Sequence, residues 1–206
     1  MTSAFKAILF DLGNVLVELD GPPIKPEWLD SSVTSEESWR RWNSSQFVEK
    51  YEKGLISARE FVEGVIGEQG LKIDAADFVK HYTLWPKALF PGVLELLADL
   101  RSRYTLALYS NTSDMHWPRM MDEMRLDGKF DYYFASFQMG MYKPDVKSFV
   151  YVADKMELEP KKILFLDDNP ANVAGARQAG LLSEQVKGIN QVKAVLLRKG
   201  LTTLRN

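Results

Sequence analysis

The chain has 206 residues, which is enough for one medium-sized domain with an insertion but too few for two full domains. Its formal net charge is −2 and its charges are interspersed, so it has no basic stripe of the kind that binds nucleic acid. The absence of cysteine excludes disulfides, thiolate metal sites and thiol nucleophiles, and no apolar run approaches the roughly 18 residues of a membrane span. We therefore expect a soluble, cytoplasmic protein with no nucleic-acid or membrane partner. The sequence leaves the oligomeric state open.

The first predicted element is a short apolar strand at residues 7–10, which ends at Asp11. This run does not alternate between polar and apolar residues, which is typical of a strand buried on both faces of a parallel sheet. Between residues 17 and 89 no strong strand is predicted, and the segments look helical and amphipathic, with a capping box at Ser57 and Glu60. We predict a small all-helical cap at residues 17–89. Because it follows the first strand directly, it should lie over the carboxyl ends of the strands.

Strands and helices alternate after this segment. A helix is predicted to begin at 91–92 and another at 169–170, where proline, glycine or asparagine marks the start. Three further apolar runs read as strands, at residues 106–109, 132–135 and 163–166. Residues 181–185 are more polar than a buried strand, which indicates an edge strand. The alternation predicts an α/β fold with a Rossmann-like parallel sheet flanked by helices, formed by residues 1–16 and 90–206.

Four polar segments follow one another along this predicted core, and three of them come directly after an apolar run. They contain Asp11; Ser110, Asn111 and Thr112; Lys143; and the pair Asp167 and Asp168. Each has a plain structural explanation when taken alone, such as a turn, loop polarity or a helix cap. Two adjacent carboxylates are nevertheless more than a cap requires, and they would repel each other unless a cation lies between them and a third acidic group. Asp11 is the obvious third group, so the set indicates a site that binds a divalent cation and a phosphate together.

The four ordered segments resemble the motifs of the haloacid dehalogenase (HAD) superfamily. The resemblance covers essentially the whole chain, and within the superfamily it is strongest to bacterial α-glucose-1-phosphate phosphatases and the phosphatase domain of soluble epoxide hydrolases. It implies that Asp11 is a nucleophile that takes up the phosphoryl group as an aspartyl phosphate. It also implies a Mg²⁺ site made by Asp11, the backbone carbonyl of Gly13, and Asp168, with Asp167 as a direct or water-mediated partner.

The same resemblance assigns the groups that would bind the phosphate. Ser110 would donate a hydrogen bond to a phosphoryl oxygen, with the amide of Asn111 or Thr112 nearby. Lys143 would neutralise developing negative charge and hold the nucleophile in place. His116 follows the second motif and could contact the substrate, although an isolated histidine is more often a surface or loop residue.

Most phosphatases of the superfamily that this chain resembles have an aspartate two residues after the nucleophile, where it acts as general acid and base. This chain has Gly13 at that position. Glycine can still offer its carbonyl to a metal, but it cannot transfer a proton, a contribution that is typically worth about 10²- to 10⁴-fold in rate. This loss matters least when the leaving group is good, as the anomeric oxygen of a sugar is. We therefore predict a Mg²⁺-dependent phosphatase of small-molecule phosphoesters, in particular sugar phosphates such as an anomeric sugar 1-phosphate.

Two alternatives stay open. A protein that binds phosphate and metal with little turnover is one, because a missing acid can also mark a retired enzyme. A 2-haloacid dehalogenase is the less favoured one, because it should not need paired acids. The cap also concentrates four tryptophans, Trp28, Trp39, Trp42 and Trp85, which we expect mainly to pack its core while one of them could face the site.

Overall fold

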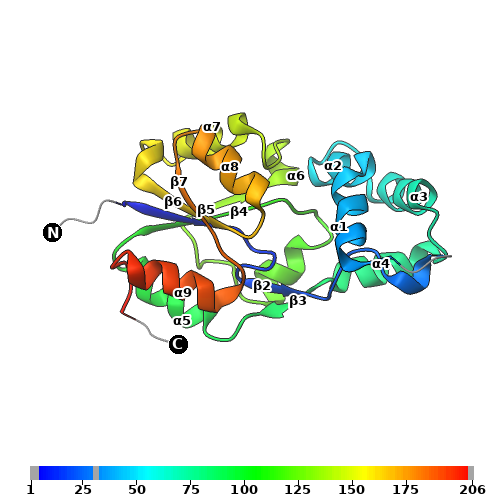
Figure 1. The fold of residues 1–206 in the computed structure, drawn as a ribbon, viewed down its shortest axis with the longest axis horizontal. Coiled ribbons are helices and arrows are strands. Elements are labelled where there is room, and N and C mark those ends of the chain that lie inside the picture. Colours follow the sequence, from blue (N-terminus) through cyan, green and yellow to red (C-terminus); the bar gives the residue numbers. More distant parts are fainter. Residues whose placement is uncertain (1–4, 30–32, 204–206) are drawn as a thin grey trace.

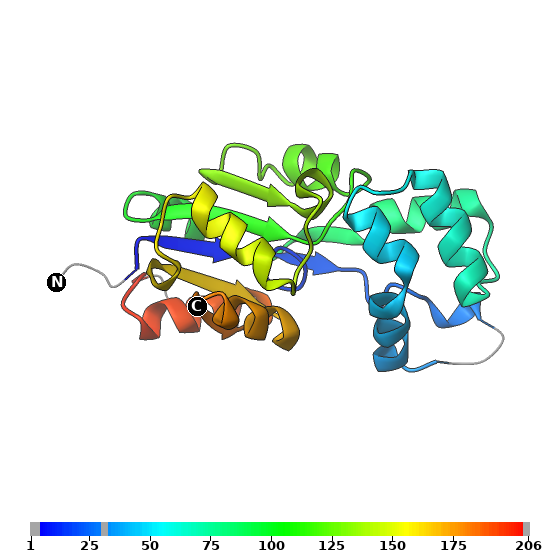
Figure 2. The ribbon, with the colours of Figure 1, turned by 90° about the horizontal axis from the view of Figure 1, so that it is seen from above.

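The structure is a computed structural model that describes residues 5–29 and 33–203. Within these residues the central element is a five-stranded parallel sheet in the spatial order β5-β4-β1-β6-β7 (Figures 1 and 2). Its strands are β1 (Ala7–Phe10), β4 (Thr105–Ser110), β5 (Tyr132–Ala135), β6 (Ile163–Asp167) and β7 (Leu182–Gln185). The predicted Rossmann-like α/β sheet is confirmed, and β7 lies at an edge of the sheet as its polar sequence indicated.

Helices cover both faces of the sheet. On one face lie α5 (Val93–Arg101) and α9 (Gly188–Arg198), and on the other lie α7 (Val146–Lys155) and α8 (Pro170–Gln178) (Figure 1). All four residues of β1 are completely buried, because alternate side chains enter one apolar cluster on each face. This double burial explains the continuous apolar run in the sequence. The shorter helical elements of the core are the π-helix η2 (Arg119–Glu123), α6 (Ser136–Met139) and the 3₁₀ helix η3 (Pro160–Lys162).

The cap folds around an aromatic cluster of its own. Its elements are β2 (Val17–Leu19), the 3₁₀ helix η1 (Pro26–Trp28), α1 (Ser35–Ser44), α2 (Gln46–Glu52), α3 (Ala58–Gln69), α4 (Ala75–Leu84) and β3 (Pro86–Leu89). The predicted capping box is present, since the Glu60 amide donates to Ser57 Oγ at 3.3 Å and the Ser57 amide donates to Glu60 Oε2 at 2.8 Å. No helix among the described residues is long and apolar enough to cross a bilayer.

The prediction of an all-helical cap needs one correction. Strands β2 and β3 lie within residues 17–89 and pair antiparallel, forming a ribbon at the base of the cap. Three and four residues are too few to give a periodic pattern, and Pro86 argues against a strand. Val17 also packs into the apolar cluster beneath the core sheet, so the base of the cap is continuous with the core.

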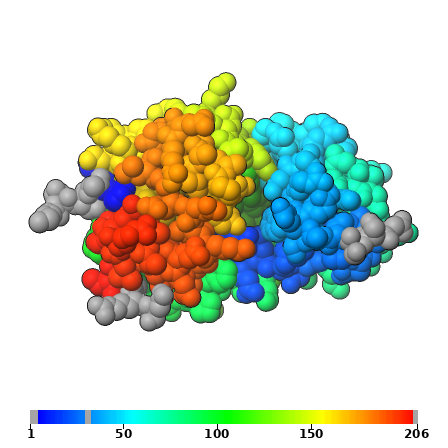
Figure 3. Space-filling model, viewed as in Figure 1, coloured from blue at the N-terminus to red at the C-terminus, as the bar shows by residue number. Residues whose placement is uncertain are grey.

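The cap contacts the core at a second place, where the carboxyl end of α2 meets α6 (Figure 3). Gly54 has a φ of 68°, and a Cβ at this position would overlap the backbone carbonyl of Phe137. Close by, the hydroxyl of Tyr51 donates to Asp114 and the hydroxyl of Tyr82 lies 3.3 Å from Ser113 Oγ. A larger side chain at position 54 would therefore push α2 of the cap away from α6 of the core.

Candidate active site

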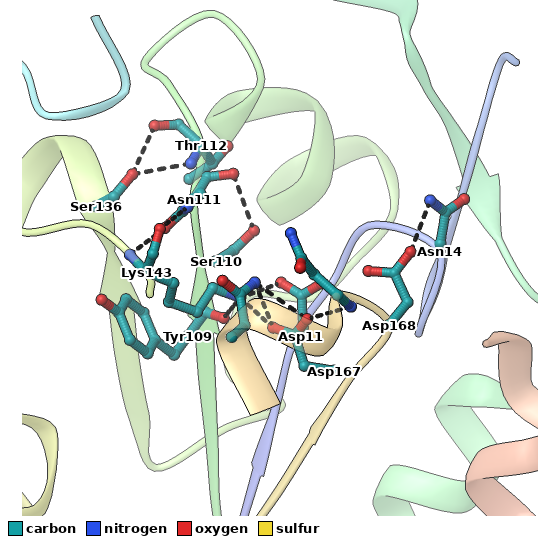
Figure 4. A network of polar contacts seen from close by, with 12 residues as sticks. Asp11, Asn14, Tyr109, Ser110, Asn111, Thr112, Ser136, Lys143, Asp167 and Asp168 are labelled. Carbon is teal, nitrogen blue, oxygen red and sulfur yellow. Dashed lines mark hydrogen bonds and ion pairs between the residues drawn. The ribbon is translucent and has the colours of Figure 1, made fainter. Parts of the chain in front are cut away.

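The carboxyl ends of β1, β4 and β6 bring the predicted polar residues together (Figure 4). Phe10 pairs with Leu108 on one side and with Leu166 on the other, so Asp11, Ser110 and Asp167 emerge at one edge of the sheet. Carboxylate oxygens of Asp11, Asp167 and Asp168 lie within 4.8 Å of one another. This convergence follows from parallel pairing, because the carboxyl ends of parallel strands share an edge of the sheet.

Lys143 reaches this cluster from the loop before α7. Its Nζ lies 2.7 Å from Asp11 Oδ1 and 2.7 Å from Asp167 Oδ2, and it also donates to the backbone carbonyl of Tyr109 at 3.0 Å. The side chain is almost completely buried. Burial lowers the pKa of Lys143, but the attraction of the two carboxylates outweighs it and the net pKa is raised. The ammonium group is therefore charged and holds Asp11 and Asp167 together.

The two acids of the pair have different surroundings. Asp167 is fully buried, and besides Lys143 it accepts hydrogen bonds from the amide of Asn169 at 2.8 Å and from Asn172 Nδ2 at 3.1 Å to each oxygen. Asp168 lines the cavity, and among the described residues its carboxylate accepts one hydrogen bond, from Asn14 Nδ2 at 3.1 Å. The oxygens of Asp167 are thus occupied by protein donors, whereas Asp168 has capacity for a ligand.

The cluster carries more negative charge than its lysine neutralises. The pKa of Asp11 is raised mainly by burial; Lys143 lowers it, and Asp167 and Asp168 raise it further. Burial and Asp167 likewise raise the pKa of Asp168. Three crowded carboxylates with one ammonium group are the chemistry of a divalent-cation site, and oxygen-only ligands suit Mg²⁺. The residues present therefore fit the expected metal.

The predicted phosphate-binding residues have unequal capacity for a ligand. Ser110 lines the cavity, and its hydroxyl makes one long contact, 3.4 Å, to the carbonyl of Asn111. The side chain of Asn111 instead holds the backbone of Lys143, donating to its carbonyl and accepting from its amide, both at 2.9 Å. The amide of Thr112 already donates to Ser136 Oγ at 2.9 Å, while the buried Oγ1 of Thr112 has no partner among the described residues. Of these groups, the Ser110 hydroxyl has capacity for a phosphate oxygen, whereas the side-chain amide of Asn111 and the backbone amide of Thr112 are already engaged.

A cavity of about 640 Å³ lies between the core and the cap, with the acidic cluster at its core end. Three of the four cap tryptophans line it, namely Trp39, Trp42 and Trp85, rather than the one expected. His116 also lines this cavity and is buried rather than on the surface. Its Nε2 donates to the carbonyl of Tyr82 at 2.6 Å, and burial lowers the pKa of His116 to about 4, so the imidazole is neutral near pH 7.

Some residues of the site were missed by sequence reasoning. Asn14 adopts a left-handed conformation with a φ of 55°, which lets its side chain reach Asp168 while its carbonyl accepts from the amide of Gly188 at 2.7 Å. Its position directly after Gly13 was the available signal. Glu52, at the end of α2, is buried and lines the cavity. The segment at residues 51–57 resembles segments of small HAD phosphatases, and this was the available signal, but the resemblance assigned Glu52 no role.

Comparison with known proteins extends this picture. Residues 5–180 match a family described as haloacid dehalogenase-like hydrolases. The chain is 23% identical to the D-ribitol-5-phosphate phosphatase of Bacteroides thetaiotaomicron (85% of this chain, 88% of the relative) and 30% identical to the sesquiterpene phosphatase astK of Aspergillus oryzae (88% and 90%). A HAD-family enzyme of B. thetaiotaomicron, solved with magnesium and inorganic phosphate, superposes with a TM-score of 0.71 at 25% identity, covering 89% of this chain and 94% of that one.

Proposed function

This chain belongs to the haloacid dehalogenase-like hydrolases, and we propose that it is a Mg²⁺-dependent phosphatase of small phosphorylated metabolites that works through an aspartyl-phosphate intermediate. Relatives named as phosphatases of ribitol 5-phosphate, phosphoglycolate and phosphorylated carbohydrates support the phosphatase activity. The observation that carries the proposal is the convergence of Asp11, Lys143 and the Asp167–Asp168 pair at the core end of the cavity.

In this proposal Asp11 is the nucleophile. A carboxylate oxygen of Asp11 forms a bond to phosphorus while the bond from phosphorus to the ester oxygen breaks, and the leaving oxygen takes a proton from water and departs as the alcohol. Water then attacks the aspartyl phosphate, which releases inorganic phosphate and restores Asp11. Lys143 holds the Asp11 carboxylate in position, and Ser110 is placed to donate to a phosphoryl oxygen.

The metal would be held by Asp11, Asp168 and the backbone carbonyl of Gly13, with Asp167 as an indirect partner through its hold on Lys143. A bound Mg²⁺ supplies positive charge that lets a phosphate dianion approach a carboxylate. Among relatives, the structure solved with magnesium and inorganic phosphate supports this assignment.

Gly13 supports a substrate with a good leaving group. No side chain at position 13 can protonate the departing oxygen, so esters of ordinary alcohols lose more rate than sugar 1-phosphates, whose anomeric oxygen leaves more easily. Three indoles line the cavity and give it an apolar wall against which a sugar ring can lie. We therefore favour anomeric sugar 1-phosphates as the substrate class.

The proposal is tested by measuring phosphate release from a panel of sugar, alkyl and aryl phosphates in Mg²⁺ and in EDTA. We expect turnover that depends on Mg²⁺ and is abolished in Asp11→Asn, while Asp154→Asn, a change at an exposed position on α7, keeps the wild-type rate. Undiminished turnover in Asp11→Asn would end the proposal. Tight binding of phosphate without any turnover would favour a binding protein, and chloride release from a 2-haloacid would favour a dehalogenase.

A further inference from the structure

The two ends of the cavity differ in charge. The core end contains the acidic cluster and two cationic side chains, Lys143 and Lys187. The part of the cap that the structure describes contributes no lysine or arginine to the lining, and the ionisable side chain that it does contribute is Glu52. The mechanism proposed above gives Glu52 no task.

Glu52 is held against the cavity by the contact between α2 and the core. It is the last residue of α2, it is 6% exposed, and Gly54 follows two residues later at the close approach to Phe137. The Glu52 carboxylate is shielded from bulk water and borders the cavity. Its charge therefore acts strongly on a substrate bound in the cavity.

The cations at the core end are already engaged by the acidic cluster and do not fully compensate an anion bound near the cap. Both oxygens nearest to the Lys143 ammonium belong to Asp11 and Asp167, which already exceed it in charge. Lys187 is exposed, and its positive charge acts on Asp168. A second anionic group on a substrate would therefore be buried beside the indoles of the cap without a counter-charge, at a cost of several kcal/mol.

We propose that the cap end of the cavity selects phosphomonoesters whose alcohol portion is uncharged, and that Glu52 excludes those that carry a second anion such as a carboxylate. This inference rests on the proposed phosphatase function and narrows its substrate class. Hydroxyl groups can donate to the Glu52 carboxylate, whereas a substrate carboxylate is repelled by it. Relatives named as phosphoglycolate phosphatases thus differ from this chain in the class of substrate.

The exclusion should depend on pH. Burial raises the pKa of Glu52 to about 7, while an interaction with Tyr142 and the charge of Lys143 lower it. An anionic substrate can avoid the repulsion only if Glu52 takes up a proton, and above its pKa this uptake becomes about tenfold less favourable for each pH unit. The other groups that face Glu52 do not titrate in this range, because the pKa values of Tyr82, Tyr142 and Lys143 are all raised above 10.

The test compares α-D-glucose 1-phosphate with α-D-glucuronic acid 1-phosphate, which differ only by an alcohol or a carboxylate at C6. We expect the ratio of their kcat/KM values with Mg²⁺ to favour the uncharged sugar by at least about twofold at pH 7, where Glu52 is half ionised, and to rise by about a further fivefold at pH 8. Because both compounds carry the same phosphate, its own titration cancels in the ratio. Where turnover of either is slow, the ratio of their inhibition constants against 4-nitrophenyl phosphate is measured instead.

Glu52→Gln should reduce this ratio and remove its dependence on pH, even if the variant is slower on both substrates. Glu49→Gln is the matched control, since Glu49 lies on the same helix but is exposed, and it should leave the ratio unchanged. Equal efficiency on both sugars in the wild type, or a ratio and pH dependence that survive in Glu52→Gln, would overturn the inference. Failure of the wild type to hydrolyse 4-nitrophenyl phosphate or either sugar phosphate would instead remove the proposed function itself.

Discussion

Replacing Lys143 by methionine should destabilise the protein and remove most of its activity. Methionine keeps much of the buried stem, which lies beside the rings of Tyr109 and Phe165, but it removes the ammonium group between Asp11 and Asp167. Removing one partner of a buried ion pair costs about 3–5 kcal/mol, because the remaining charges are left uncompensated. In addition, kcat/KM should fall by at least about 10²-fold, since the phosphoryl group loses a neighbouring positive charge.

The loss of stability is measured by urea unfolding in EDTA, followed by circular dichroism. With an m-value of about 3 kcal/mol/M, the midpoint of Lys143→Met should lie about 1–1.7 M below that of the wild type. Adding Mg²⁺ should restore part of the difference, because a bound cation again compensates the carboxylates. Lys147→Met, at an exposed position four residues further on, should change the free energy of unfolding by less than about 0.5 kcal/mol. A change below about 1 kcal/mol in Lys143→Met would refute the reasoning.

Three further substitutions test other parts of the structure. Gly13→Asp should accelerate hydrolysis of alkyl phosphates more than that of aryl phosphates, since the nearest atom to a new Cβ is 3.4 Å away and the carboxyl group restores a proton donor; equal acceleration would argue against a missing acid. Gly54→Ala should cost about 1–3 kcal/mol more in unfolding free energy than Gly70→Ala, because both glycines have positive φ but only Gly54 meets the carbonyl of Phe137. His116 has a pKa of about 4 in the folded protein and 6.5 as a reference, so its contribution to stability is complete above pH 6.5 and is lost as the pH falls toward 4. His116→Gln should therefore be less sensitive to acid by about 1.4 kcal/mol per pH unit in that range, and identical acid unfolding curves for the two proteins would contradict this.

The sheet could be predicted from sequence because its central strands are buried on both faces. A strand such as β1, with four fully buried residues, gives an unbroken apolar run that ends at its functional residue. The beginnings of two helices could also be predicted, since Asn169 and Ser57 are N-cap residues that accept hydrogen bonds from amides of the first turn. The β2–β3 ribbon could not be predicted, because its two strands lie at opposite ends of the cap sequence and their pairing depends on the fold of the whole cap.

The sequence predicted residues that the structure brings together at the candidate site, but it did not predict the different contacts that each of them makes. Asp167 and Asp168 are adjacent and chemically identical, and the structure separates them by direction: one points to Lys143 and Asn172, the other into the cavity. Glu52 shows the same limit, since its exposure to the cavity depends on how α2 contacts α6, which no property of the α2 sequence reveals.

The cap is joined to the core by two unlike attachments. The ribbon of β2 and β3 carries both crossings of the polypeptide, whereas the meeting of α2 with α6, above it in Figure 1, is held only by noncovalent contacts. An opening of the cavity would have to break the contact between α2 and α6 and the hydrogen bond of His116 to Tyr82, while the ribbon keeps the cap connected to the core. Glu52 and Gly54 lie at the contact between α2 and α6, so an opening that breaks this contact would carry the Glu52 carboxylate away from the core. Closure of the cap over a bound substrate would then place the Glu52 carboxylate beside it before the chemical step, which would couple closure to the exclusion of anionic substrates.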